Sequence, residues 1–150
     1  MFRGIHRLSL DNKGRLSIPA AYRQRLLEAS EGRMVLTIDR DRCLLLYPLE
    51  VWEEIERQLL RLSSTNKRAR ALKRLLMGHA EDCEIDSGGR ILLPGPLRGF
   101  AALEKRVVLV GQGNKFEIWN DSAWQAWCEA ALDGENDDGE PMPDLDALAF

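Results

Sequence analysis

The stretch that decides the fold is Leu10-Asp11-Asn12-Lys13-Gly14-Arg15-Leu16-Ser17-Ile18-Pro19, and it returns 75 residues later as Ile85-Asp86-Ser87-Gly88-Gly89-Arg90-Ile91-Leu92-Leu93-Pro94. An Asp at the start of a short loop can accept hydrogen bonds from the backbone amides just after it, and Gly adopts a positive φ without steric cost. The alternating apolar residues on either side of the loop favour half-buried strands. Each copy is therefore predicted to form a strand, a tight turn and a second strand that ends at proline.

The similarity between the two halves continues beyond this motif. Val35-Leu36 aligns with Val108-Leu109, and the apolar and aromatic positions of 44–55 align with those of 116–127. A duplicated unit that keeps its core and varies its surface gives this pattern. We divide the chain into a first module at 1–62, a basic helical connector at 63–79, a second module at 80–132 and an acidic tail at 133–150, which its composition predicts to be disordered.

In the first module, the motif is followed by helical and strand patterns. Pro19 is expected at the first position of a helix over 20–29. The strands 34–38 and 43–47 enclose a polar turn and are predicted to form a hairpin, after which Pro48 opens a second helix.

The second module repeats this order with small changes. Pro94-Gly95-Pro96 weakens the helix that corresponds to 20–29. The strands 107–111 and 115–119 are predicted to form the second hairpin. Asp121 is expected to be the N-cap of the closing helix.

The connector has no counterpart in the second module. Its residues 63–66 are predicted to cap a helix over 67–77 that Gly78 ends. Five basic side chains leave two interpretations open, an ordinary solvated helix face or a contribution to anion binding: Lys67, Arg68, Arg70, Lys73 and Arg74.

Charge is divided unevenly along the chain, although the net charge is only −3. Residues 1–25 carry six basic side chains and one acid, whereas residues 131–150 carry seven acids and no Lys or Arg. This split favours an N-terminal end that faces a polyanion and an acidic tail; two merely solvated surfaces are the alternative.

The sequence offers little catalytic chemistry. Its two histidines, His6 and His79, have no local metal-ligand partner at helical spacing, and no nucleophile or phosphate-loop motif occurs. Cys43, Cys83 and Cys128 lack CxxC spacing and are expected to be buried thiols in a reducing cytoplasm. With no long apolar run, we expect a cytoplasmic protein that is not an enzyme, does not enter a membrane, and needs no metal, cofactor or small-molecule substrate.

Comparison of the two modules separates structural residues from residues that could bind DNA. The shared motif residues are predicted to be structural: Asp11, Gly14 and Pro19 in the first module, and Asp86, Gly89, Arg90 and Pro94 in the second. The residues around them change from basic to acidic or neutral, because His6, Arg7 and Lys13 are replaced by Glu81, Asp82 and Gly88. Only the first module is therefore electrostatically suited to neutralise phosphates, with a β-ribbon of a width that fits the major groove.

The doubled Asp-x-x-Gly-Arg motif, the opening Met-Phe-Arg-Gly and the chain length resemble the MraZ family of bacterial transcriptional regulators, whose modules are similar to the SpoVT–AbrB domain. The resemblance covers about residues 1–130 and leaves the acidic tail outside it. It implies an α+β, β-rich fold of two tandem swapped-hairpin or double-split β-barrel modules with flanking helices. It also implies a nucleoid-associated repressor that binds direct repeats of double-stranded DNA in the promoter of the division and cell-wall gene cluster, as a ring-shaped homo-oligomer.

Transferred residue by residue, the resemblance places DNA contacts on Arg3, Lys13 and Arg15, with Arg7 and Arg23 as neighbours. Arg90 lies among acids in the sequence and is expected instead to pair with a carboxylate. Another function stays open, that of an antitoxin-like protein whose acidic tail occupies a basic cleft on a toxin.

Assembly is the last expectation. Two modules with unlike surfaces are suited to head-to-tail contacts, which close into a ring when the rotation permits. The aromatic face of Trp119, Trp124 and Trp127 is either part of such an interface or part of the core within one chain.

Overall fold

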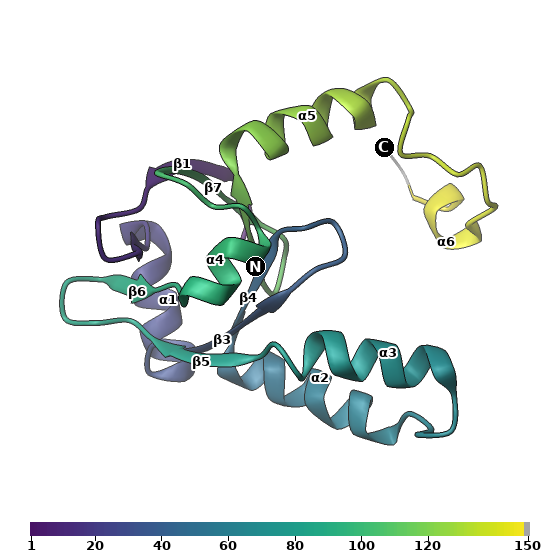
Figure 1. The fold of residues 1–150 in the computed structure, drawn as a ribbon, viewed down its shortest axis with the longest axis horizontal. Helices are drawn as coiled ribbons and strands as arrows, with labels where there is room; N and C mark the ends of the chain where they lie inside the picture. The colour runs from purple at the N-terminus through teal and green to yellow at the C-terminus, as the bar shows by residue number, and fades with distance from the viewer. Residues whose placement is uncertain (149–150) are drawn as a thin grey trace.

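An antiparallel sheet of six strands, in the order β1-β7-β8-β4-β3-β5, runs through the molecule beside a two-stranded ribbon of β2 and β6 (Figure 1). The computed structural model describes residues 1–148, apart from the side chains of residues 145 and 146. The strands are β1 (Ile5–Ser9), β2 (Arg15–Ser17), β3 (Arg33–Ile38), β4 (Leu44–Pro48), β5 (Glu81–Glu84), β6 (Arg90–Leu92), β7 (Arg106–Gly111) and β8 (Phe116–Asn120). The helices are α1 (Ala20–Ser30), α2 (Leu49–Arg61), α3 (Lys67–Leu76), α4 (Gly95–Phe100), α5 (Asp121–Leu132) and α6 (Pro143–Asp146).

The opening strands of each module pair with strands of the other module. β1 lies against β7, with Ser9 opposite Arg106, and β5 lies against β3, with Glu84 opposite Arg33. β2 and β6 pair with each other, so that the buried Leu16 faces Ile91. The two modules therefore share one sheet and one ribbon, and the residues next to each turn come from both halves of the chain.

The main core lies between the inner face of the sheet and a layer formed by α1, α4 and the β2–β6 ribbon. Alternation along the strands supplies it, because every second side chain points to the same face. Leu36, Phe116, Leu16 and Ile91 are completely buried there. The motif residues on either side of each turn are thus fixed by the packing of the core beneath them.

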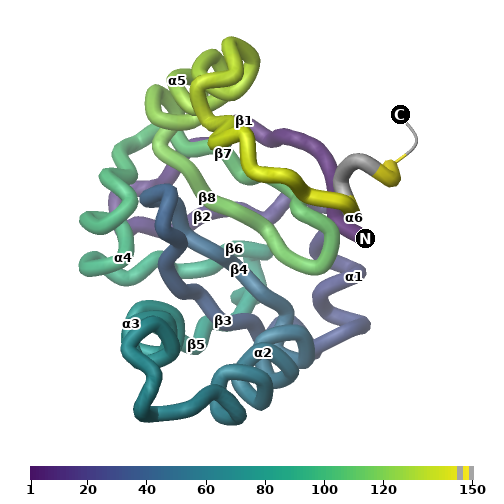
Figure 2. Tube along the Cα trace, turned by 90° about the vertical axis from the view of Figure 1, so that its right-hand side faces the viewer, coloured from purple at the N-terminus to yellow at the C-terminus, as the bar shows by residue number. Residues whose placement is uncertain are grey.

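The outer face of the sheet is covered in two separate places, by α5 at one end and by α2 with α3 at the other (Figure 2). Trp119 of β8 and Trp124 of α5 are buried between that helix and the sheet, whereas Trp127 of α5 keeps 37% of its surface exposed. Of the two interpretations of this aromatic face, burial within one chain therefore holds for two of the three tryptophans. At the other end, Thr37 donates a hydrogen bond to the Leu76 carbonyl (2.7 Å), which fixes the end of α3 to β3.

The expected class and both expected hairpins are confirmed, because the protein is α+β and β3 pairs with β4 as β7 pairs with β8. At the N-terminal ends of two helices, the N-cap differs by one residue from the predicted position. Pro19 is the N-cap of α1 and not its first helical residue. The N-cap of α5 is Asn120, whose side chain accepts from the Ala123 amide (3.0 Å), and not Asp121. Asn caps a helix as well as Asp does, and Asn120 still has the extended backbone that a cap requires.

The expected burial of the cysteines needs correction, the weakened helix of the second module is confirmed, and the tail contains one short helix. Cys43 is buried, but Cys83 and Cys128 are only partly buried, since they lie at the margins of the core clusters. The weakened helix of the second module is α4, which has six residues against eleven in α1. In the tail, 133–142 contains no helix or strand, whereas α6 follows it; residues 149 and 150 lie outside the described residues.

Candidate nucleic-acid interface

Each turn is held by its motif aspartate. Asp11 Oδ1 accepts hydrogen bonds from the amides of Lys13 (2.9 Å) and Arg15 (2.8 Å), and Asp11 Oδ2 accepts from Arg15 Nε (2.6 Å). Asp86 makes the same bonds with Gly88 and Arg90 in the second turn. Arg15 therefore has a carboxylate partner just as Arg90 does, which corrects the expected contrast between the two arginines.

These bonds stabilise the ionised form of both carboxylates. The backbone amide of Arg15, together with its side chain and the Lys13 amide, lowers the pKa of Asp11 from 3.8 to about 2. The backbone amide of Arg90, with that of Gly88, also lowers the pKa of Asp86. Both turns are consequently charged pairs at neutral pH, held in one geometry by their own backbone.

Each motif glycine is packed by an arginine from the other module. Gly14 has φ +79°, and a Cβ at that position would lie 2.7 Å from Cζ of Arg98. Gly89 has φ +77°, and a Cβ there would lie 2.6 Å from Cζ of Arg23. Arg98 Nε donates to the Leu93 carbonyl (2.9 Å), as Arg23 Nε donates to its equivalent, the Ile18 carbonyl (2.6 Å). Arg23 thus lies next to the second turn, in the position that Arg98 occupies at the first.

Arg3 lies at the far end of β1 from the first turn. A Cβ on Gly111 would lie 2.5 Å from the Arg3 amide nitrogen, at the β7–β8 end of the sheet. At the other end of β1, the Leu10 amide donates to the Lys105 carbonyl (2.8 Å). Arg3 and Lys13 are therefore separated by the length of the strand, and the structure does not bring them together.

Arg7 lies between these two ends and is paired. Its guanidinium donates to the carboxylate of Asp121, the first residue of α5. The Arg7 side chain is 62% exposed, so this ion pair is a surface contact that water screens. Arg7 therefore faces solvent near the turn with part of its charge already balanced.

The exchange of strands brings three further basic residues to the first turn, all from the second module. Arg98 packs on Gly14, Lys105 bonds to the residue before Asp11, and Arg106 lies opposite Ser9. We call the group of Lys13, Arg15, Arg98, Lys105 and Arg106 the first-turn surface. Its second-module members could not be recognised from sequence motifs, because only the β1–β7 pairing places them there.

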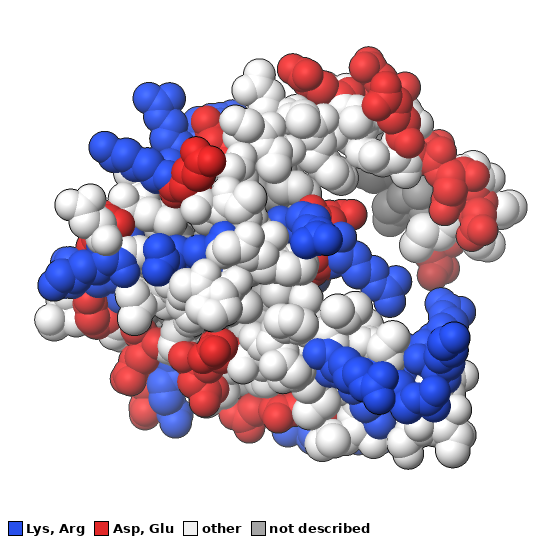
Figure 3. All heavy atoms as spheres, viewed as in Figure 1, with Lys and Arg blue, Asp and Glu red and all other residues white. Residues whose placement is uncertain are grey.

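The second turn has the same construction with different charge. Its surroundings include Glu31 and Glu84 beside Arg23, and β5 adds Asp82. Arg33, which corresponds to Arg106, lies 3.6 Å from a carboxylate oxygen of Glu31. Figure 3 shows Lys and Arg side chains interleaved with acids at the left of the view. The first turn also has an acid, Glu104, in the position of Glu31. It has Arg7 and Ser9 on β1 where the second turn has Asp82 and Glu84 on β5, so cations are less balanced by acids at the first turn.

The β2–β6 ribbon presents an outward face between the two turns. Leu16 and Ile91 point inward and are completely buried, whereas Arg15 lies opposite the exposed Leu92. Arg90 lies on the same outward side, opposite Ser17. A two-stranded ribbon of this kind has the width to enter the major groove of DNA.

Within the described residues, one group could offer ligands to a metal ion. The ligand atoms of Asp39, Cys43 and Glu117 lie within 4.8 Å of one another, where the β3–β4 hairpin meets β8. Burial, and after it the nearby carboxylates, raises the pKa of the Cys43 thiol, and burial raises the pKa of Glu117. The thiol is therefore neutral at pH 7, and a cation would have to displace its proton.

Two comparisons with known proteins relate the chain to others. A family model described as "MraZ protein, putative antitoxin-like" matches residues 1–75 and again residues 76–140. The chain is 53% identical to the transcriptional regulator MraZ of Methylococcus capsulatus and 51% identical to that of Thioalkalivibrio sulfidiphilus, over 100% of both chains in each case. It is 56% identical to the transcriptional regulator MraZ of Idiomarina loihiensis, over 91% of both chains.

The chain belongs to the MraZ family. The comparisons extend the likeness beyond the range that the motifs suggest, because two MraZ relatives align over the whole chain, acidic tail included. The resemblance inferred from the doubled motif ended near residue 130, since the tail contains no motif of its own. No described helix combines the length and apolarity needed to cross a bilayer.

Proposed function

We propose that this member of the MraZ family is a transcriptional regulator that binds double-stranded DNA through its first-turn surface. The observation that carries the proposal is the strand exchange that gathers basic residues of both modules around the first turn. The equivalent turn of the second module has Asp82 and Glu84 where the first has Arg7 and Ser9. The names of the relatives, all transcriptional regulators, support the same function.

The chemistry of the first-turn surface suits two kinds of contact. Lys13, Lys105 and Arg106 are exposed and can neutralise phosphates, which supplies affinity in a salt-dependent way. Arg15 is oriented by Asp11 through Nε, and no described residue binds its terminal nitrogens. A guanidinium held in this way can form a bidentate contact with guanine, worth about 1–3 kcal/mol of discrimination.

The further parts of the proposal concern the oligomer, the operator and the regulated promoter, and they rest on the expected assembly and on the family resemblance. We propose a ring-shaped homo-oligomer, because head-to-tail contacts between unlike modules close into a ring when the rotation permits. Such a ring presents its first turns in the same sense, so the operator should contain direct repeats about 10–10.5 bp apart. We propose that the regulated promoter is the protein's own, upstream of the division and cell-wall gene cluster, and that binding represses it at the nucleoid in the cytoplasm.

The paired arginines give a sharp test. Arg15→Ala and Arg90→Ala remove the same local contacts with a motif aspartate, so both variants should lose a similar, small amount of stability. Binding to the DNA upstream of the gene should be lost only in Arg15→Ala, in titrations that include scrambled DNA as the non-specific reference. The proposal is wrong if Arg90→Ala, shown to be folded and assembled, fails to bind while Arg15→Ala still binds.

A second function is favoured by the family description, which includes the term antitoxin-like. The acidic tail would then occupy a basic cleft on a toxin. This alternative predicts that deleting 133–150 abolishes protection against a toxin encoded beside the gene. The regulator predicts instead that the same deletion leaves sequence-specific DNA binding intact.

A further inference from the structure

A groove of about 470 Å³ opens between α3 and the β3–β4 hairpin, away from the first turn. Its floor and walls are apolar and are formed chiefly by Leu45, Tyr47, Leu72, Leu75, Leu76 and Phe100. Leu75 keeps 38% of its surface exposed, and the Thr37–Leu76 hydrogen bond fixes the adjoining end of α3. The groove is thus a depression with apolar side chains in contact with water.

Three cations and one acid, Asp39, border this groove. Cζ of Arg42 lies 5.0 Å from the ring centre of Phe100, and Nζ of Lys115 lies 5.7 Å from the ring centre of Tyr47. Arg40 lines the same rim. No described carboxylate lies within 4.0 Å of any of these cationic groups. An occupant that matched the groove would combine apolar side chains with negative charge.

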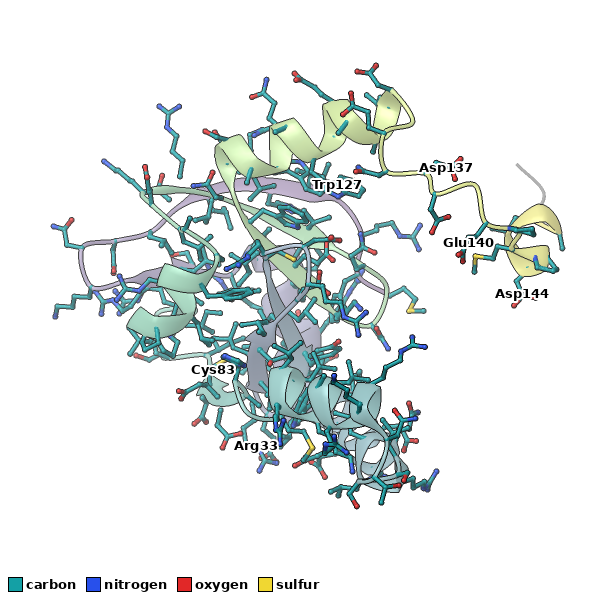
Figure 4. The ribbon with its side chains drawn as sticks, turned by 45° about the vertical axis from the view of Figure 1, so that its right-hand side comes forward. Arg33, Cys83, Trp127, Asp137, Glu140 and Asp144 are labelled. Atoms are coloured by element: carbon teal, nitrogen blue, oxygen red, sulfur yellow. The ribbon has the colours of Figure 1, made fainter. Side chains whose placement is uncertain are left out.

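The C-terminal segment 140–148 has this composition. It contains the acids Glu140, Asp144 and Asp146, and its Met142 and Leu148 are each 55% exposed. The hydrogen bonds recorded for the tail all join residues within the tail or to the end of α5. In Figure 4 the labelled Asp137, Glu140 and Asp144 lie on a segment that stands clear of the sheet and of α3.

We propose that the groove is a docking site for residues 140–148 of the same chain. Arg40, Arg42 and Lys115 would face the acids, and the apolar floor would cover Met142 and Leu148. Seven residues, 133–139, connect α5 to this segment, and an extended chain of that length spans at most about 23–25 Å. Because the attraction is partly electrostatic and acts at the surface, salt should weaken the docking.

Zero-length cross-linking tests the proposal on the full-length chain. A carbodiimide joins a carboxylate to a lysine amine only where the two are in direct contact. Peptide mass spectrometry should find Lys115 linked to Glu140 or Asp144, with a yield that falls as salt is raised. An equal mixture of light and isotope-labelled chains should give these links only between peptides of the same label.

Paired variants make the test specific for docking. Leu148→Asp should abolish the Lys115 link, because it puts a charge where the groove is apolar. Leu132→Asp makes the same change at a residue that is 87% exposed at the end of α5, and it should leave the link intact.

Four results would overturn the proposal. Links between light and labelled chains would show that the segment docks on a second copy. Links to Lys13 or Lys105 in place of Lys115 would show that the tail covers the first-turn surface. Absence of any Lys115 link, or its persistence in Leu148→Asp, would show that the groove does not hold the segment.

Discussion

At the scale of single residues, the motif Asp fixes the turn and the Arg together. Asp11 and Asp86 each bind two backbone amides and an arginine Nε, so the aspartate and the arginine recur as a unit. The bare motif therefore cannot tell a DNA-binding arginine from a structural one. The difference between Arg15 and Arg90 arises from the residues that surround each pair.

The lowered pKa of Asp11 makes a prediction about acid stability. A carboxylate with a pKa of about 2 in the folded protein and 3.8 when unfolded stabilises the fold above pH 4, and loses that effect as the pH falls to 2. Asp11→Asn should therefore be less stable than wild type at neutral pH, with the difference shrinking between pH 4 and pH 2. Urea unfolding at several pH values measures this. Glu135→Gln, at an exposed residue of the tail, is the control, and a difference independent of pH would contradict the account.

The motif glycines make a prediction about strain and packing. Gly14→Ala and Gly89→Ala place a methyl group against Arg98 and Arg23 at positive φ, and each should cost about 1–2 kcal/mol or more. Gly99→Ala is the matched control, because it lies in α4 with no atom within 4 Å of the added carbon, and it should stabilise by about 0.5–1 kcal/mol. Thermal unfolding compares the three, and equal stabilities would contradict the packing described for the turns.

At the scale of elements, the sequence predicts the local structure well and the pairing poorly. The hairpins β3–β4 and β7–β8 follow from apolar runs around short turns, which are local signals. The pairing of β1 with β7 joins residues about 100 positions apart in the sequence. Neither the charges nor the periodicity of β1 indicates which strand it pairs with. Lys105 and Arg106 were missed as candidate site residues for this reason.

The exchanged pairing predicts that neither module folds alone. Fragment 1–79 lacks the partners of β1 and β2, and fragment 80–150 lacks those of β5 and β6. Each should show little native structure by circular dichroism at low concentration, and mixing the two should restore the spectrum of the whole chain. A fragment that stays monomeric, unfolds cooperatively and matches its half of the native spectrum would contradict this prediction.

At the scale of the whole molecule, the two modules have the same arrangement of strands and turns but differ in charge. The shared scaffold could be predicted from the repeated motif, and the basic character of residues 1–25 correctly suggested an uneven charge distribution. Arg3 shows the limit of that reasoning, because Arg3 and Lys13 are close in the sequence but lie at opposite ends of β1. The DNA-binding surface proposed here is a property of the assembled fold and not of the N-terminal segment.

The most direct test of this claim compares Arg106→Ala with Arg33→Ala, two equivalent β-strand arginines at the two turns. DNA affinity is measured as a function of salt on variants whose assembly has been verified. If Arg106 contacts a phosphate, its loss should lower the slope of log affinity against log salt by about 1, while Arg33→Ala leaves the slope unchanged. An unchanged slope in Arg106→Ala, or an equal change in both variants, would contradict a DNA-binding surface assembled around the first turn from both modules.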